Sequence, residues 1–414
     1  MRATATAMRP HGSRFGPSVL IVAPEPFYED RGTPIAVGQL AAALVKLEYR
    51  TELITYPIGD DVMLPGLRIL RSTNVPGLRH VPIGFSLRKV VLDLLMLPML
   101  WRKLRPDAYL IVHALEEMAL PVIWLCRHRG IPVIYDMQSC IPDQLHRHWL
   151  FGTKPAQRLL RSIERWMLVN ANAVICSAGL GNHVQRVAPA SRATEWMFAG
   201  QLRSDGRDSA EALRDDLGIA RDAPVALYTG TFEAYQGLDL LIDAIPAVVA
   251  AVPETVFVLV GAMDDELGRV PAVSSLIEAG RIVVVPRQPR RLIPAYLMIA
   301  DVLVSPRAYG DNVPLKIFDY MLSGKPIVAT DIPAHRSLLS EHTAMLVPRV
   351  ATDLADAIVR VLREPDLGEA LSSTALLEAG RYPGGESFVG LVRRLYEETL
   401  RRNGARPARG QSRA

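Results

Sequence analysis

The sequence predicts an α/β fold made of two doubly wound, Rossmann-like domains. Three observations support this fold class. Short runs of branched apolar residues alternate with amphipathic segments from residue 18 to residue 402, which is the pattern of parallel strands joined by helices. The length of 414 residues exceeds what one ordinary core holds. A polar stretch with two glycines, 199–208, separates two such series and reads as a linker.

In the first series, each expected strand is a continuous apolar run, as is typical of a strand buried on both faces. Gly32 and Pro34 open a helix after the first strand. The expected strands are 18–26, 51–56, 67–70, 108–113, 132–136 and the two ends of 173–197, with helical segments at 85–104, 116–128 and 146–166 and inside 173–197.

The second series repeats this pattern after the linker. The helix GLDLLIDAIPAVV carries apolar residues at helical spacing. The expected strands are 223–230, 256–262, 281–286, 301–305 and 326–330, followed by a strand and two helices in 344–380 and a closing helix at 386–402.

The stretch 305–331 reads as strand, loop, helix and strand. Pro314 can open the helix, since its missing N–H costs nothing there, and Gly324 can close it. In an open parallel sheet, ligands bind outside the carboxyl ends of the strands. Free N–H groups at such a helix start favour an anion, above all a phosphate.

Two carboxylates frame this helix, Asp311 in the loop before it and Asp319 inside it. They can hold hydroxyl groups at the two ends of a ligand whose phosphates lie at the helix start, which is the layout of a nucleotide sugar. The alternative is an acid that favours the helix dipole and a solvated acid on an exposed face. Spacing alone favours this alternative.

The stretch resembles the donor-binding signature of the family-4 retaining glycosyltransferases, which have the GT-B fold. That signature has two Glu eight residues apart, where this chain has Asp311 and Asp319. The tail of the signature is matched by Gly324, Pro326, Ala329 and Thr330. The resemblance implies that Asp311 lies near the donor sugar and Asp319 near the ribose. It also implies a ligand cleft between the two domains.

The family binds the donor phosphates with an Arg and a Lys in a strand–Gly–loop–helix motif. Here Gly230 matches the glycine, but Thr231 and Gln236 replace the two cations. We expect Lys316 and Arg307 to supply the missing charge. The donor-binding residues that we expect in this domain are Gly230, Thr231, Gln236, Arg307, Asn312, Val313, Pro314, Leu315, Lys316 and Asp319.

In the first domain, the resemblance implies that Gly32 belongs to a loop near the donor diphosphate; an ordinary turn is the alternative. His113 ends a strand at the ligand-binding edge, where it meets the ligand or is a buried structural histidine. Gln138 stands where the family often has a His, so only a hydrogen-bonding role remains for it. We assign catalytic positions to Asp311, Gln138 and His113.

Composition excludes several classes of protein. The net charge is +4, but residues 1–16 carry three arginines and 401–414 carry five, with no acid in either tail. The basic balance therefore belongs to the tails, and a nucleic-acid-binding fold is not indicated. Three widely spaced cysteines suggest neither a disulfide framework nor a zinc site. We expect no cofactor, no metal, no signal peptide and a cytoplasmic location.

Segments 78–105 and 146–166 mix arginines with leucines, phenylalanine and tryptophan. Such helices suit peripheral contact with the inner membrane surface. The alternative is that they simply pack on the sheet.

The resemblance implies a metal-independent glycosyltransferase that moves a sugar, with retention, from a nucleotide-sugar donor to a polysaccharide, glycolipid or lipid-linked acceptor. The alternatives are a non-catalytic nucleotide-sugar-binding or partner subunit and a nucleotide-sugar 2-epimerase. The expected organisation is a tail 1–16, an acceptor-side domain 17–200, a donor-side domain 201–382, a helix 383–402 that crosses back to the first domain, and a basic tail 403–414.

Overall fold

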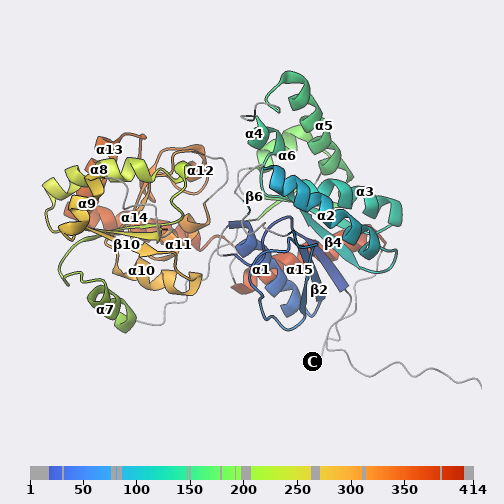
Figure 1. The fold of residues 1–414 in the computed structure, drawn as a ribbon, viewed down its shortest axis with the longest axis horizontal. Coiled ribbons are helices and arrows are strands. Elements are labelled where there is room, and N and C mark those ends of the chain that lie inside the picture. Colours follow the sequence, from blue (N-terminus) through green and yellow to red (C-terminus); the bar gives the residue numbers. More distant parts are fainter. Residues whose placement is uncertain are drawn as a thin grey trace, which may run out of the picture. The chain divides into compact units, whose positions relative to one another are not determined.

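The computed structural model describes residues 18–29, 32–75, 81, 86–146, 148, 151–177, 180–191, 193–196, 207–262, 271–309, 314–382 and 385–404. The chain divides into two compact units (Figure 1). The first comprises Met1–Ile175, Val184–Thr194 and Val389–Ala414, and the second comprises Cys176–His183 and Glu195–Phe388. The last helix of the chain thus groups mainly with the first unit.

The first sheet has seven strands in the order β3-β2-β1-β4-β5-β6-β7. The registers from β3 to β5 are parallel. Its strands are β1 (Ser18–Val22), β2 (Arg50–Thr55), β3 (Leu67–Arg71), β4 (Ile111–Leu115), β5 (Val133–Met137), β6 (Ala173–Ser177) and β7 (Ala193–Trp196). The helices along this part of the chain are α1 (Gly32–Lys46), α2 (Leu87–Lys103), the 3-10 turn η1 (Glu116–Met118), α3 (Ala119–Arg129), α4 (Ile141–Leu145), α5 (Lys154–Asn170), α6 (Gly181–Val187) and, at the end, α15 (Gly385–Arg402).

The second sheet has six strands, all parallel, in the order β10-β9-β8-β11-β12-β13. They are β8 (Val225–Thr229), β9 (Val256–Ala262), β10 (Ile282–Pro286), β11 (Val302–Ser305), β12 (Ile327–Thr330) and β13 (Met345–Val347). The helices are α7 (Arg207–Asp216), η2 (Ala234–Gln236), α8 (Leu238–Ala251), α9 (Pro271–Glu278), η3 (Arg290–Leu292), α10 (Ile293–Ile299), α11 (Leu315–Leu322), α12 (Pro333–Arg336), α13 (Ala351–Arg363) and α14 (Pro365–Ala379).

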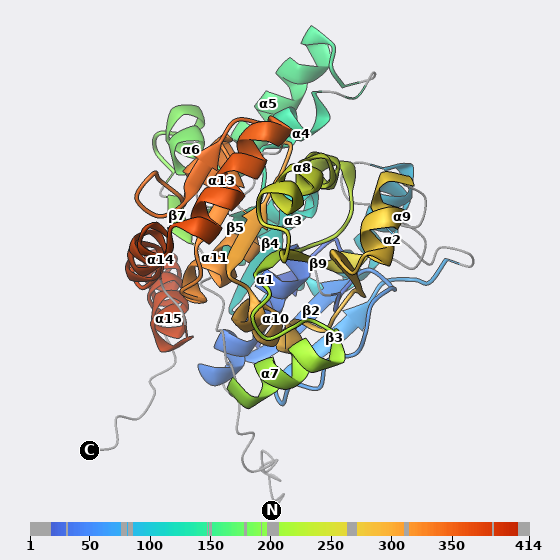
Figure 2. The ribbon, with the colours of Figure 1, turned by 90° about the vertical axis from the view of Figure 1, so that its left-hand side faces the viewer.

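Alternating residues of the second sheet enter two separate cores, as the period of two in a strand requires. Val225 and Leu227 of β8 pack with α10, α11 and α14, whereas Ala226 and Tyr228 pack with α8 and α13. Figure 2 shows α8 and α13 next to each other. Both faces of the sheet are therefore covered, which explains why its strands are apolar without interruption.

The predicted fold class is confirmed. In each unit, the first strand lies between the second and the fourth strands of that unit. The strand order therefore reverses between β1 and β4 and between β8 and β11. These reversals are the topological switch points at which ligands bind in such sheets. The sequence did not predict the helices α4, α7, α9, α10 and α12.

Candidate functional site

The switch point of the second unit is held by close backbone contacts. Gly237, at φ +69°, lies against the carbonyl of Pro306, and Gly261, at φ +123°, lies against that of Gly230. A Cβ atom at either glycine would come within about 2 Å of the carbonyl oxygen. The carboxyl end of β9 and the loops after β8 and β11 are therefore fixed to one another at the edge of the sheet.

Lys316, in the first turn of α11, lies over the loop that follows β8. Its Nζ donates to Gln236 Oε1 at 3.3 Å and lies 4.3 Å from the centre of the Tyr228 ring. A Cβ atom on Gly230 would be 3.4 Å from the same Nζ. Lys316 has no carboxylate partner among the described residues. Burial, and next the charge of Arg307, lower the pKa of Lys316 to about 7.

Arg307 is the second cation at this edge of the sheet, and its side chain is buried. Its Nε donates to the Tyr309 carbonyl at 3.0 Å, and its guanidinium lies 5.3 Å from the centre of the Tyr235 ring. Its own carbonyl accepts from Thr330 Oγ1 at 2.6 Å. The arginine is thus fixed between the loop after β11 and the end of β12.

Burial and the positive charge at this edge of the sheet lower the pKa of His335. Its Nδ1 must donate to the Thr330 carbonyl, 2.7 Å away, so its Nε2 accepts from Ser305 Oγ at 3.0 Å. Burial, and then the charges of Lys316 and Arg307, lower the pKa of His335 to about 4. The imidazole is therefore neutral, and the two cations are stabilised best by an anion supplied from outside.

Asp319 pairs with Arg290 from the loop that follows β10. The Arg290 guanidinium donates to Asp319 Oδ1 at 3.1 Å. Burial raises the pKa of Asp319, and the attraction of Arg290 opposes this rise. Arg290 binds Oδ1 of Asp319, and a carboxylate can accept a further hydrogen bond from a donor such as a ligand hydroxyl.

The hydroxyl of Thr231 is buried and has no hydrogen-bond partner among the described residues. Such an unsatisfied group costs free energy unless a ligand or water completes it. The carbonyl of Thr231 accepts from Tyr228 Oη at 2.7 Å, which holds this loop beside Lys316.

The start of α11 differs slightly from the prediction. Pro314 caps the helix in an extended conformation, and Leu315 is its first residue. Gly324, at φ +67°, follows the helix end as predicted. Asp311, Asn312 and Val313 lie outside the described residues, so the structure says nothing of the predicted sugar-side carboxylate.

In the first unit, His113 is entirely buried at the centre of a polar network. Its Nδ1 lies 3.0 Å from the Tyr396 hydroxyl on α15, and its Nε2 lies 3.1 Å from Asp136 Oδ2. Asp136 Oδ1 accepts from Gln138 Nε2 at 2.5 Å. The structural alternative for His113 agrees with this burial, and the network ties α15 to β4 and β5.

We expect Tyr396→Phe to lower the free energy of unfolding by about 1–3 kcal/mol, because His113 loses a buried hydrogen-bond partner. Thermal unfolding followed by circular dichroism measures this change. Arg394→Ala, a substitution on the same helix, serves as the control, and equal stability of Tyr396→Phe and wild type would contradict the structural role.

Glu116 was missed by the sequence analysis. It follows β4 directly, adopts the left-handed region at φ +50°, and accepts from Ser139 Oγ at 3.0 Å. Burial, and then the charge of Glu117, raise the pKa of Glu116 to about 8. A strained backbone and a protonated carboxyl at the functional edge are features of sites that act on ligands. Gly32, in contrast, is exposed at the start of α1, where a Cβ would meet nothing.

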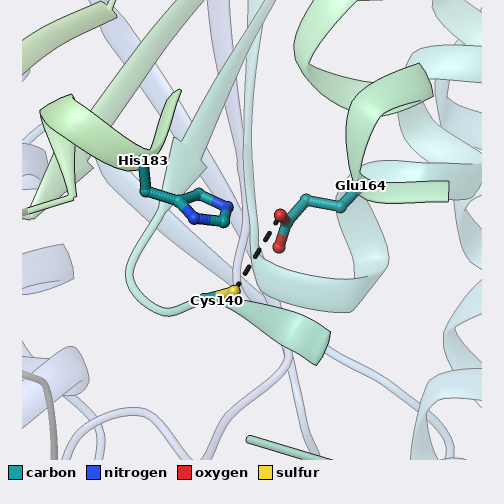
Figure 3. A group of neighbouring side chains, drawn as sticks. All are labelled: Cys140, Glu164 and His183. Carbon is teal, nitrogen blue, oxygen red and sulfur yellow. Dashed lines mark hydrogen bonds between the residues drawn. The ribbon is translucent and has the colours of Figure 1, made fainter. Parts of the chain in front are cut away.

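Glu164 positions the loop after β5. Its Oε2 accepts from the Ile141 N–H at 3.1 Å, and its Oε1 lies 3.9 Å from Cys140 Sγ (Figure 3). His183, the third side chain in that figure, belongs to a segment that groups with the second unit. The buried Glu164 carboxylate thus fixes the turn that carries Ser139 and Cys140.

The two sheets, with Arg307 in the loop after β11 and Lys316 at the start of α11 beside the second switch point, define a two-domain α/β protein. The sequence matches "Glycosyl transferases group 1" over residues 223–364 and "Glycosyl transferase 4-like domain" over residues 31–193. The chain belongs to this group 1, family-4-like class of GT-B glycosyltransferases.

Three curated relatives match parts of the chain at 25–30% identity. A putative teichuronic acid biosynthesis glycosyltransferase of Bacillus subtilis is 30% identical over 181 residues, which are 42% of this chain and 43% of that protein. An alpha-D-kanosaminyltransferase of Streptomyces kanamyceticus is 25% identical over 66% of this chain and 72% of its own length. A phosphatidyl-myo-inositol mannosyltransferase of Mycobacterium leprae is 27% identical over 52% and 59%.

Solved structures share the fold over nearly the whole chain. Sucrose-phosphate synthase from Thermosynechococcus elongatus superposes with a TM-score of 0.73 at 21% identity, covering 94% of this chain and 100% of that one. Anabaena HepE in complex with UDP-glucose superposes with a TM-score of 0.67 at 16% identity, covering 94% and 100%. At these identities the likeness shows the fold alone.

Proposed function

We propose that the protein is a glycosyltransferase that moves a sugar from a nucleotide-sugar donor to a saccharide or lipid-linked acceptor, with retention of configuration. The proposal rests on the pair of cations, Lys316 and Arg307, at the switch point of the second unit. The hydroxyl of Thr231, in the loop after β8, is buried and lacks a hydrogen-bond partner among the described residues. A diphosphate supplies the negative charge and the acceptor oxygens that this arrangement requires.

The cations stand in for the two that the family places at residues 231 and 236. Lys316 reaches the same loop from α11 and donates to Gln236 itself. We therefore infer that the positive charge has moved from the loop after β8 to the start of α11 rather than being lost. Fixed cations of this kind stabilise the charge that develops on a leaving diphosphate, which is the basis for proposing metal-independent chemistry.

Asp319 is proposed to bind the ribose, with Arg290 orienting its carboxylate. Gln138 and Glu116, at the carboxyl edge of the first sheet, are proposed to face the acceptor or the donor sugar. HepE was crystallised with UDP-glucose, and the kanosaminyl and mannosyl relatives are named for sugar transfer. These names support a nucleotide-sugar donor for this chain as well.

We expect one nucleotide sugar to raise the melting temperature of the wild-type protein and to leave Asp319→Ala unchanged. At a donor concentration 100 times its Kd, binding stabilises the folded state by about 2.7 kcal/mol, which shifts the melting temperature by several degrees. A thermal-shift screen of UDP-, GDP- and dTDP-sugars makes this measurement.

Asp366→Ala, on the exposed surface of α14, is the matched control and should keep the full shift. If no donor stabilises the wild-type protein, the donor-binding site is refuted. If a donor binds but no sugar is transferred to any acceptor, the non-catalytic alternative replaces the enzyme. The configuration of a product, read by NMR of its anomeric proton, tests retention.

A further inference from the structure

Helix α2 is apolar on two opposite sides. Leu92, Met96 and Leu100 are buried on one side. The other side carries an exposed stripe at helical spacing, made of Leu87, Val91, Leu94, Pro98 and Trp101. Leu87 is 78% exposed, and Leu94 and Trp101 are 59% exposed. A surface helix in a globular protein needs only one apolar face, so the second stripe has no role in the core.

The neighbouring helices extend this apolar surface. Helix α3 packs against both α2 and α5 (Figure 1), and Arg129 of α3 donates to the Trp101 carbonyl at 3.0 Å while lying over the Trp101 ring. Trp124 of α3 is 49% exposed. A hollow of about 460 Å³ between α3 and α5 is lined by Leu120, Pro121, Trp124 and Trp166.

The exposed charged side chains on the three helices themselves are all cations. The exposed cations of the three helices are Arg88, Arg102, Arg127, Lys154, Arg158, Arg161 and Arg165. Helices α2, α3 and α5 are described throughout, and their only carboxylates are Asp93 and Glu164. Asp93 accepts from Tyr56 Oη at 2.6 Å, and Glu164 is buried against the Ile141 N–H. Both acids are therefore engaged with the protein and do not offset the exposed cations.

We propose that the outer face of α2, α3 and α5, called here the docking face, binds the surface of an anionic lipid bilayer. Leucines and tryptophans beside arginines are the residues that enter the interface of headgroups and acyl chains. The hollow lined by Trp124 and Trp166 would receive hydrocarbon chain, while the arginines contact lipid phosphates. The exposed stripe of α2 is about 25 Å long. An anionic bilayer offers negative charge along this whole length, whereas a protein partner would need an acidic surface of matching shape.

This proposal does not depend on the donor site. The structure itself contains, among the described residues, no helix long and apolar enough to cross a membrane, so the inferred contact is peripheral. Each arginine near an anionic membrane surface strengthens binding about fivefold, and apolar insertion adds a part that salt does not screen.

The test is flotation of the full-length protein with vesicles of phosphatidylcholine alone and with 30% phosphatidylglycerol. We expect binding to the anionic vesicles that weakens, without vanishing, between about 0.1 M and 0.5 M salt. Leu94→Gln/Trp124→Gln should lower the partition coefficient about tenfold or more. Arg158→Gln/Arg161→Gln should lower it roughly 30-fold on anionic vesicles only.

Leu377→Gln is the matched control, since Leu377 is 75% exposed on α14 of the other unit, and it should bind as the wild type does. The arginine variant keeps the test decisive if the apolar variant unfolds, because its two side chains are exposed. Wild-type protein that does not float, or both double variants floating like the wild type, would overturn the proposal. Self-association through this face without vesicle binding would also overturn it.

Discussion

Lys316→Met should raise the dissociation constant for UDP about 30-fold or more while leaving the protein folded. The substitution keeps the length of the side chain but removes the cation beside Gln236 and Gly230. A charge-assisted hydrogen bond to phosphate is worth about 2 kcal/mol or more, which corresponds to this factor. Isothermal titration calorimetry with UDP measures the change.

The titration of Lys316 gives a second, more specific readout. Its pKa is about 7 in the ligand-free protein, below the ordinary 10.5. A bound diphosphate favours the charged form and raises this pKa. Binding at pH 8 should therefore take up close to one proton, visible as a dependence of the binding enthalpy on the buffer. UDP affinity should fall as the pH rises above 7, and Lys316→Met should abolish the uptake.

The same depressed pKa affects stability with a defined sign. Between pH 7 and 10.5 the unfolded chain binds more protons at Lys316 than the folded protein does. The contribution of this group to the free energy of unfolding therefore increases with pH through that window. Lys316→Met removes this contribution.

Lys325→Met is the control for both readouts, because Lys325 follows the opposite end of α11. It should bind UDP with wild-type affinity and proton uptake. UDP affinity unchanged in Lys316→Met would refute the proposal that this lysine replaces the missing phosphate ligand at residue 236.

Gly237→Ala should lower the free energy of unfolding by about 3 kcal/mol or more. Its Cβ would lie 2.1 Å from the Pro306 carbonyl oxygen, so the loops after β8 and β11 must separate. The left-handed backbone at φ +69° adds about 1–2 kcal/mol of strain for a residue with a side chain. Chemical denaturation of the purified variant measures the loss.

Gly280→Ala isolates the steric part of this effect. Gly280 has nearly the same backbone conformation, φ +68°, but a Cβ there would meet nothing within 4 Å. We expect a loss of only about 1 kcal/mol from this control. Equal losses in the two variants would show that the contact with Pro306 does not hold the site together.

The sequence predicted the two-domain fold because its strands are apolar runs of a kind that parallel sheets require. Helices α7 and α9 were not predicted because they are short and rich in polar or small residues, which leaves few apolar residues to mark a helical period. The role of Lys316 and Arg307 as phosphate ligands stays a prediction from the sequence, and the structure adds the hydrogen bond from Lys316 to Gln236.

Pairs that depend on strand order were out of reach of the sequence. Arg290 meets Asp319 across 29 residues, and His335 meets Ser305 across 30. Neither contact has a local signal, since each arises only when β11 lies between β8 and β12. Glu116 was missed for another reason, because an acid at a strand end looks like any solvated loop residue until its burial is known.

The position of Tyr396 has a consequence for synthesis of the chain. Most of the first unit is synthesised before the second, yet its buried network includes a hydroxyl from α15, which follows the second unit in the sequence. The order of synthesis therefore differs from the order of folding. The second unit is complete at Phe388 and can fold before α15, the last helix of the first unit, has been synthesised. A fragment that stops before residue 385 would lack the Tyr396 partner of His113. We therefore expect chaperones that hold incompletely folded chains to bind the first unit.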